Sequence, residues 1–110
     1  MIDRSRLREL VDDFGEDDLM DLIESFLEEA AEAVEGLRAM VSETYSEERS
    51  QRFHFLKGCA LNLGATELGE LCETLEKRDG GFSESEYDDF CVQFQSVQNY
   101  FADADLKLSA

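Results

Sequence analysis

His54 is the only histidine in this 110-residue chain, and it is the residue with the clearest capacity for chemistry. A neutral imidazole has a lone pair that can attack phosphorus, carry a proton or bind a metal ion. A lone histidine in a helical domain is more often a surface residue without chemistry, so its neighbours must decide. Lys57 follows one helical turn later, where its ammonium group can reach a phosphoryl group on the ring. Gly58 should cost a helix about 1 kcal/mol relative to alanine, so its presence needs a reason, such as the close approach of another backbone.

Apolar spacing predicts that His54 lies on a helix but away from the stripe that faces the core. That stripe consists of Phe53, Leu56, Ala60 and Leu63. Residues three, four and seven positions from His54 share its face, and they are Ser50, Gln51, Lys57, Gly58 and Leu61. Because these neighbours are mostly small or polar, the ring should be able to meet solvent or another protein.

A longer motif continues from the histidine. The segment from His54 to Glu76 reads HFLKGCALNLGATELGELCETLE. It begins with histidine, one residue, leucine, lysine and glycine, and a second glycine follows six residues after the first. This order closely resembles the signature of histidine-containing phosphotransfer (HPt) domains. The matching segment covers about a fifth of the chain, and the helices predicted around it fall where the bundle of that family needs them.

The resemblance implies a role for each of four residues. His54 would be the phosphoacceptor, and Lys57 would be the nearby positive charge that attracts the phosphoryl group. Gly58 would be the place where a response-regulator receiver domain comes close. Glu76 would accept a hydrogen bond from the ring nitrogen that is not phosphorylated.

The resemblance also implies a phosphotransfer protein of a two-component phosphorelay. Its partners would be receiver domains and a histidine kinase, including kinases of the hybrid type. Phosphoryl groups would pass between His54 and a receiver aspartate, and Mg²⁺ would come with the receiver, so that the chain needs no cofactor of its own. The sequence contains no glycine-rich phosphate loop and no serine nucleophile motif, which indicates a phosphoryl carrier without an ATP site rather than an enzyme. Arg52 and Phe53 depart from the small residues that are frequent before the histidine in this family, and this bears on partner choice.

Helical periodicity recurs in five amphipathic segments, with no strand pattern between them. They span about residues 7–14, 17–42, 46–63, 66–75 and 83–101. Gly64 is expected to end the third segment, and Ser46 and Thr66 are expected to cap the third and fourth. Ser83 and Glu86 have the spacing of a capping box at the start of the fifth.

These segments predict an all-α fold. The second to fifth should form an antiparallel four-helix bundle, and the short additional N-terminal helix should cover one end. The length fits a single domain over residues 1–110, with the core bundle at about 17–103.

Two sets of apolar residues leave a choice between docking and packing. Near the start of the chain, one set consists of Leu7, Leu10, Val11, Leu19 and Met20. These residues could form an apolar docking surface beside the histidine, or they could pack the first helix onto the bundle. Phe55, next to the histidine, could be a docking contact or a partly exposed neighbour of the core.

The charge of the chain excludes several classes of partner. Ten basic and 27 acidic residues give a formal charge of −17, which repels nucleic acid and anionic membrane surfaces alike. No apolar stretch has the length of a membrane span or of a secretory signal. Three widely spaced cysteines fit buried thiols in a reducing compartment better than a disulfide framework. The sequence therefore predicts a cytoplasmic protein, and we expect a monomer.

Three other functions compete with phosphotransfer. One is an acidic helical adaptor that binds receiver or kinase domains without carrying phosphate. Another is an acidic helical pairing module, although the apolar stripes of the second and fifth segments suffice only for an internal core. The third is a carboxylate-bridged di-metal bundle, which needs two Glu-x-x-His pairs. Position 51, three residues before His54, is Gln, and there is no second histidine, so the metal interpretation fits poorly.

Overall fold

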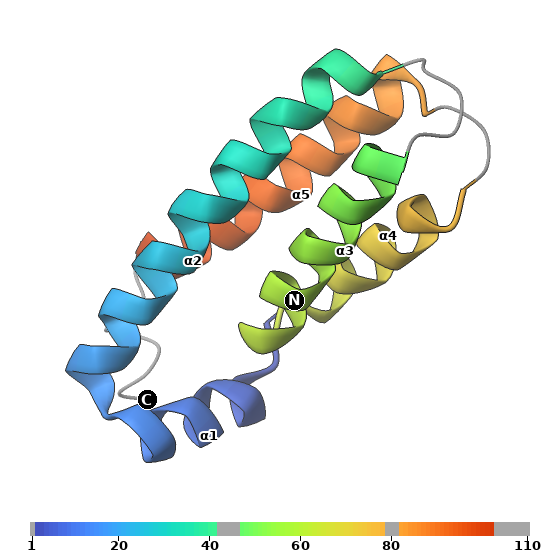
Figure 1. The fold of residues 1–110 in the computed structure, drawn as a ribbon. Coiled ribbons are helices and arrows are strands. Elements are labelled where there is room, and N and C mark those ends of the chain that lie inside the picture. Colours follow the sequence, from blue (N-terminus) through green and yellow to red (C-terminus); the bar gives the residue numbers. More distant parts are fainter. Residues whose placement is uncertain (1, 42–46, 79–81, 103–110) are drawn as a thin grey trace.

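The structure is a computed structural model, and it describes residues 2–41, 47–78 and 82–102. Regular secondary structure in this part of the chain is helical. The elements are α1 (Arg4–Phe14), α2 (Glu16–Leu37), the 3₁₀ turn η1 (Arg38–Met40), α3 (Glu47–Asn62), α4 (Thr66–Glu76) and α5 (Glu84–Ala102) (Figure 1). The prediction of an all-α fold is confirmed.

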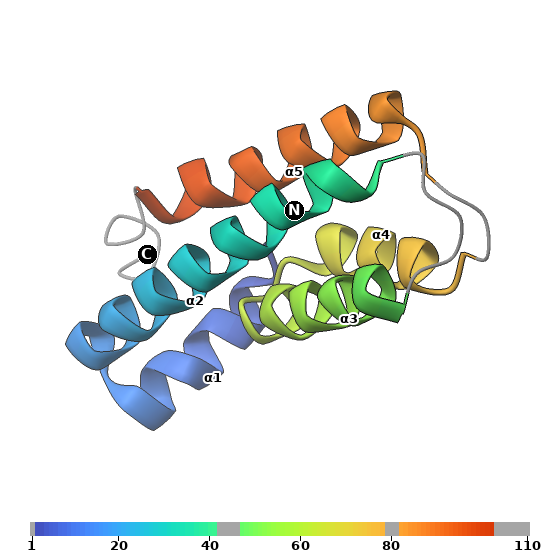
Figure 2. The same ribbon diagram turned by 45° about the horizontal axis from the view of Figure 1, so that its top comes forward.

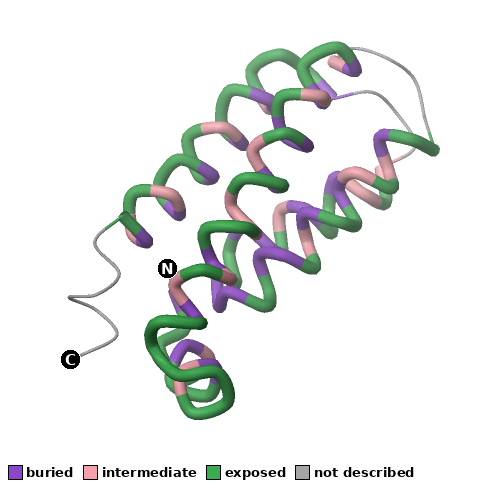
Figure 3. Tube along the Cα trace, turned by 60° about the vertical axis from the view of Figure 1, so that its left-hand side comes forward, coloured by how far each residue is buried: buried purple, intermediate pink, exposed green. Residues whose placement is uncertain are grey.

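Helices α2 to α5 form an elongated bundle, and α1 lies across one end of it (Figures 1 and 2). Helices α2 and α4 run in one direction, while α3 and α5 run in the other, so that each helix is antiparallel to the next (Figure 1). The buried positions recur along one side of each helix and face the interior (Figure 3). The core includes the predicted stripe of α3, and its four members are Phe53, Leu56, Ala60 and Leu63.

Helix α2 ends earlier than its apolar stripe predicts, at Leu37 instead of about residue 42. A tertiary contact lies at this end of the helix. The Tyr87 hydroxyl donates a hydrogen bond of 3.1 Å to the Val34 carbonyl oxygen, the atom that accepts from the Arg38 backbone N–H in a continuous α-helix. That N–H bonds to the Glu35 carbonyl instead, and the chain tightens into η1.

The turn between α3 and α4 is fixed by Gly64, as the sequence predicts. Its φ of +79° is a left-handed value that favours glycine. The Gly64 N–H bonds to the Leu61 carbonyl and the Ala65 N–H to the Ala60 carbonyl, which is the hydrogen-bond pattern of a Schellman motif. The segment before α1 closes over this turn, because the Asp3 N–H donates to the Gly64 carbonyl oxygen at 2.7 Å.

The predicted caps have different outcomes. The capping box of α5 is confirmed, since the Ser83 hydroxyl accepts from the Glu86 N–H and the Glu86 carboxylate accepts from the Ser83 N–H. The prediction that Thr66 caps α4 is wrong, because Thr66 is the first helical residue and Ala65 is the N-cap. The Ala65 N–H is already used by the Schellman turn, so α4 starts directly from that turn. Ser46 lies outside the described residues.

The apolar residues near the start of the chain pack internally. Leu7, Leu10 and Leu19 are buried in the core, so the docking interpretation is wrong for these three side chains. Their burial follows from the position of α1, which crosses the open end of the bundle and needs an apolar face against it. Val11 and Met20 are half-buried and pack against the same core.

All three cysteines are free, as predicted, and two of them, Cys59 and Cys72, are buried. Burial raises the pKa of the Cys72 thiol to about 12, so this thiol stays protonated and unreactive at neutral pH. No helix in the described ranges is long and apolar enough to cross a bilayer.

Candidate functional site

Helix α3 presents His54 to solvent. Since the core stripe of the helix turns inward, the ring points away from the bundle, and 68% of the His54 side chain is exposed. The predicted position of the histidine off the core stripe is therefore confirmed. An exposed ring on a rigid helix can meet a second protein without any rearrangement of the fold.

Glu76, the last residue of α4, connects the histidine and the lysine. Its Oε2 lies 3.1 Å from His54 Nδ1, and its Oε1 lies 3.4 Å from Lys57 Nζ. The Lys57 contact is an ion pair whose geometry falls short of a hydrogen bond, since Glu76 Oε1 is buried without a hydrogen-bond partner in the described residues. Only 19% of the Glu76 side chain is exposed, so this carboxylate is held between the two helices rather than in bulk water.

The contact with Glu76 decides which nitrogen of a neutral His54 ring carries the proton. An ionised carboxylate can only accept hydrogen bonds, so Nδ1 must be the donor. In the neutral ring the lone pair then lies on Nε2. The arrangement provides a nucleophilic nitrogen on the exposed side of the ring and a fixed acceptor on the other side.

Ser50 holds the end of α4 against α3, a contact that sequence reasoning missed. Its hydroxyl donates a hydrogen bond of 3.2 Å to the backbone carbonyl oxygen of Glu76. Ser50 lies one turn before His54 on the same face of α3, and this spacing was the available signal. The contact fixes the position of the Glu76 backbone and therefore the reach of its carboxylate to the ring.

The surface around His54 is open and partly apolar. A Cβ atom added to Gly58 would meet nothing within 4 Å, so no other part of the described chain needs this glycine. Leu61, one turn further along the same face, is 47% exposed, and Phe55 is 41% exposed. These large apolar side chains and the bare backbone at Gly58 give a partner protein a surface to approach closely.

Arg52, which departs from the family pattern, takes part in internal packing. Its guanidinium group lies over Gly36 of α2, where an added Cβ would come within 2.2 Å of the nearest guanidinium nitrogen. The same guanidinium forms an ion pair of 3.3 Å with Glu48. Gly36 is thus explained by a close approach of α3 to α2.

A model of the Hpt domain family matches residues 21–104, which takes in nearly all of α2 and the whole of α3 to α5. The chain belongs to the Hpt domain family. This result confirms the resemblance that the His54–Glu76 segment indicates, and it gives the chain a histidine phosphotransfer role in two-component signalling. Hpt domains are phosphoryl carriers rather than kinases, and they interact with kinases and receiver domains in phosphorelays.

Comparison with curated proteins and with solved structures gave no match. The roles of His54, Lys57, Gly58 and Glu76 therefore stay predictions, now supported by the geometry that brings His54, Lys57 and Glu76 together. Within the described residues, no three His, Cys, Asp or Glu side chains come together in a way that could hold a metal ion.

Proposed function

We propose that this Hpt protein carries a phosphoryl group on Nε2 of His54 and exchanges it with the aspartate of receiver domains. The observation that supports this most directly is the contact of His54 Nδ1 with Glu76 Oε2, which leaves Nε2 as the free nucleophile on an exposed ring. A histidine kinase would supply the phosphoryl group to the relay.

The proposed transfer needs no general base on this chain. Nε2 attacks the phosphorus of a receiver aspartyl phosphate, the N–P bond forms, and the P–O bond to the aspartate breaks. The bond electrons leave with the aspartate carboxylate. The phosphorylated ring keeps its proton on Nδ1 and carries a positive charge, which the Glu76 carboxylate, 3.1 Å away, would stabilise. The partner would bring Mg²⁺ and would position the phosphoryl group.

Lys57 and Gly58 have distinct roles in this proposal. Lys57 would shift its contact from Glu76 Oε1 toward the phosphoryl oxygens. Its side chain is 23% exposed, so its ammonium group can reach a phosphoryl group on the solvent side. Gly58 would let the backbone of the receiver come against α3, since the space above it is open. Phe55 and Leu61 would add apolar contact at either side.

The first test replaces the nucleophile. His54→Gln should accept no phosphoryl group from a phosphorylated receiver under conditions in which the wild-type protein becomes labelled. Because His54 is exposed, the variant should keep the helical circular dichroism spectrum and the unfolding midpoint of the wild type. Equal labelling of His54→Gln and wild type would overturn the proposal. Binding of His54→Ala to receivers, with no phosphate ever detected on the wild-type protein, would instead support the adaptor alternative.

The second test asks which ring nitrogen is modified. Phosphohistidine is stable in alkali and labile in acid, and ¹⁵N and ³¹P NMR of the ring distinguish the two linkages. We expect the phosphorus to be bonded to Nε2, with the Nδ1 proton retained. Phosphorus on Nδ1 would contradict the role given to Glu76, although it would leave His54 as the phosphoacceptor. Cytoplasmic location and a monomeric state remain predictions from the sequence.

A further inference from the structure

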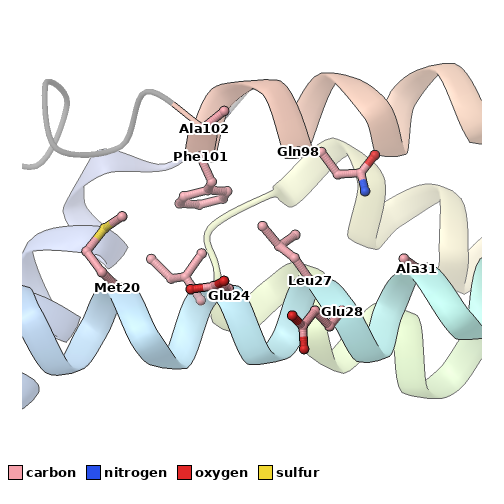
Figure 4. A pocket seen from close by; sticks show the side chains of 9 residues that line it. Met20, Glu24, Leu27, Glu28, Ala31, Gln98, Phe101 and Ala102 are labelled. Atoms are coloured by element: carbon pink, nitrogen blue, oxygen red, sulfur yellow. The ribbon is translucent and has the colours of Figure 1, made fainter.

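An apolar groove lies between α2 and α5, away from His54. Its volume is about 440 Å³, and Figure 4 shows how it is lined. Phe101 of α5 points toward α2, and the side chains of Met20 and Leu27 point from α2 toward α5 (Figure 4). Met20, Leu27 and Ala31 are each half-buried, so the groove keeps apolar surface accessible to a partner.

The groove lies on one flank of α2, and α3, the helix that contains His54, contacts the other flank. At about 100° per residue, Met20, Leu27 and Ala31 share one side of the helix, the side toward α5. Gly36, which Arg52 of α3 covers, lies on the other side. A protein in the groove would therefore leave the surface around His54 uncovered.

The charged residues that line the groove are acidic. Helix α2 contains nine acidic residues and no lysine or arginine, and two of the acidic side chains, Glu24 and Glu28, line the groove itself. Both are exposed. An apolar floor with an acidic rim complements a segment that combines apolar anchors with lysine or arginine.

A second copy of the chain and the C-terminal residues 103–110 complement the acidic groove less well than a basic segment does. A second copy of the chain would bring another formal charge of −17 and another acidic rim to the contact. Residues 103–110, which follow Ala102 at the groove, contain Asp103, Asp105 and Lys107 and so add a net negative charge. A basic segment of a different protein is the occupant that the charges favour.

We propose that the α2–α5 groove docks a basic amphipathic helix of a partner protein while His54 remains free for phosphotransfer. From Met20 to Ala31 the groove follows about 16 Å of helix, or three turns, at about 1.5 Å per residue. A matching helix would place apolar anchors at positions i, i+4 and i+7, with basic residues beside them to meet Glu24 and Glu28. Such a contact would hold the Hpt protein near a partner without blocking its phosphohistidine.

The test uses a labelled 14-residue peptide of leucine and lysine, with its leucines on one helical face, and a scrambled peptide of equal composition. On titration into the full chain, we expect amide shifts at Met20, Leu27 and Phe101 and none at His54 or Gly58. The pair of substitutions Glu24→Gln and Glu28→Gln should weaken peptide binding about threefold or more, as expected for the loss of two exposed ion pairs. Met20→Gln should weaken it as well.

The matched control is the pair Glu29→Gln and Glu32→Gln, which makes the same change of net charge on exposed positions of α2 outside the groove. This pair should leave peptide affinity within twofold, and all these variants should accept phosphoryl groups at the wild-type rate. Equal weakening by the control pair, or equal binding of the scrambled peptide, would show general charge attraction and overturn the proposal.

Two further outcomes would also overturn it. Removal of residues 103–110 could raise peptide affinity tenfold or more, which would make that segment the occupant. Sedimentation could instead show a dimer that Met20→Gln dissociates, which would make a second copy the occupant. Because phosphoryl acceptance is measured separately, failure here would leave the proposed function intact.

Discussion

Glu76 has two contacts that change in different ways when the ring is phosphorylated. Its Oε2 accepts from a ring nitrogen that stays protonated, so this contact should strengthen as the ring becomes positive. Its Oε1 pairs with Lys57, and a phosphoryl group, which carries up to about two negative charges, would compete for that ammonium group. Glu76 is therefore expected to stabilise the product of transfer, whereas Lys57 moves from one anion to another.

Substitution of Glu76 should separate charge from position. We expect Glu76→Gln to slow phosphoryl acceptance about threefold and Glu76→Ala about tenfold, because glutamine keeps an oxygen that can accept from Nδ1 and alanine does not. In ¹⁵N spectra of the neutral ring, Glu76→Ala should lose the preference for a proton on Nδ1. The rate is measured by single-turnover transfer from one phosphorylated receiver, with Glu73→Ala as the control on the exposed face of α4. Unchanged spectra and rate in Glu76→Ala would contradict the assignment.

Lys57 should tune the transfer without being essential to it. At about 4 Å, a unit charge pair contributes roughly 1 kcal/mol in a water-like medium and about 4 kcal/mol at an intermediate dielectric. Lys57 is partly exposed, so we expect Lys57→Ala to slow transfer about tenfold and Lys57→Arg to restore most of the rate. Lys77 supplies the control, because it is 70% exposed and pairs with Glu73 instead. Rates for Lys57→Ala and Lys77→Ala that agree within twofold would exclude the tuning role.

At the scale of elements, substitution by alanine should change the stability of the fold in opposite directions at Gly58 in α3 and at Gly64 in the turn that follows it. Gly58→Ala should stabilise the fold by up to about 1 kcal/mol, since the added Cβ meets nothing within 4 Å and alanine favours a helix. Gly64→Ala should destabilise it by about 2 kcal/mol or more, because φ is +79° and the Cβ would lie 2.8 Å from the Asp3 carbonyl oxygen. Urea unfolding measures both.

The same pair tests why Gly58 is present. If Gly58 serves a partner, Gly58→Ala should slow transfer to receivers although the protein is more stable, and Gly58→Leu should slow it further. Lower stability of Gly58→Ala in urea, together with unimpaired transfer, would show an internal role that the open space above Gly58 does not explain.

Much of the helical arrangement could be predicted because it depends on local patterns. The core stripe of α3, the stop at Gly64 and the capping box at Ser83 need only periodicity and cap chemistry. The early end of α2 was not predicted, and it coincides with a contact from Tyr87, 53 residues away from Val34 in sequence, which no local pattern reveals. Cap prediction failed at Thr66 for a related reason, because the preceding turn already determines where α4 begins.

The candidate site divides in the same way. The motif from His54 to Glu76 indicates the members of the site, but the ion pair of Lys57 with Glu76 and the hydrogen bond from Ser50 arise only when α3 and α4 pack. The α2–α5 groove is likewise a product of packing, because Met20, Leu27 and Ala31 remain half-buried where α2 lies beside α5.

At the scale of the whole molecule, a bundle with a formal charge of −17 keeps three buried weak acids protonated, the thiols of Cys59 and Cys72 and the phenol of Tyr87. Burial raises the pKa of Cys72 to about 12, and burial together with a hydrogen bond to Cys91 raises the pKa of Tyr87 to about 12. Burial also raises the pKa of Cys59. Each of these groups would become a further negative charge on ionisation, inside a chain that already repels anions.

Alkaline pH should therefore lower the stability of this protein. The unfolded chain releases the Cys72 proton near 9.0 and the Tyr87 proton near 10.0, whereas the folded chain keeps both until about 12. The folded state thus binds more protons between these values, and the free energy of unfolding should fall as pH rises from 9 to 12. Each group contributes up to about 1.4 kcal/mol per pH unit.

Urea unfolding at several pH values measures the fall in the free energy of unfolding. Cys72→Ala should reduce this fall between pH 9 and 10, before Tyr87 begins to contribute. An equal fall in Cys72→Ala that disappears in 1 M NaCl would assign the effect to net charge instead, since salt screens exposed charges far more than buried ones.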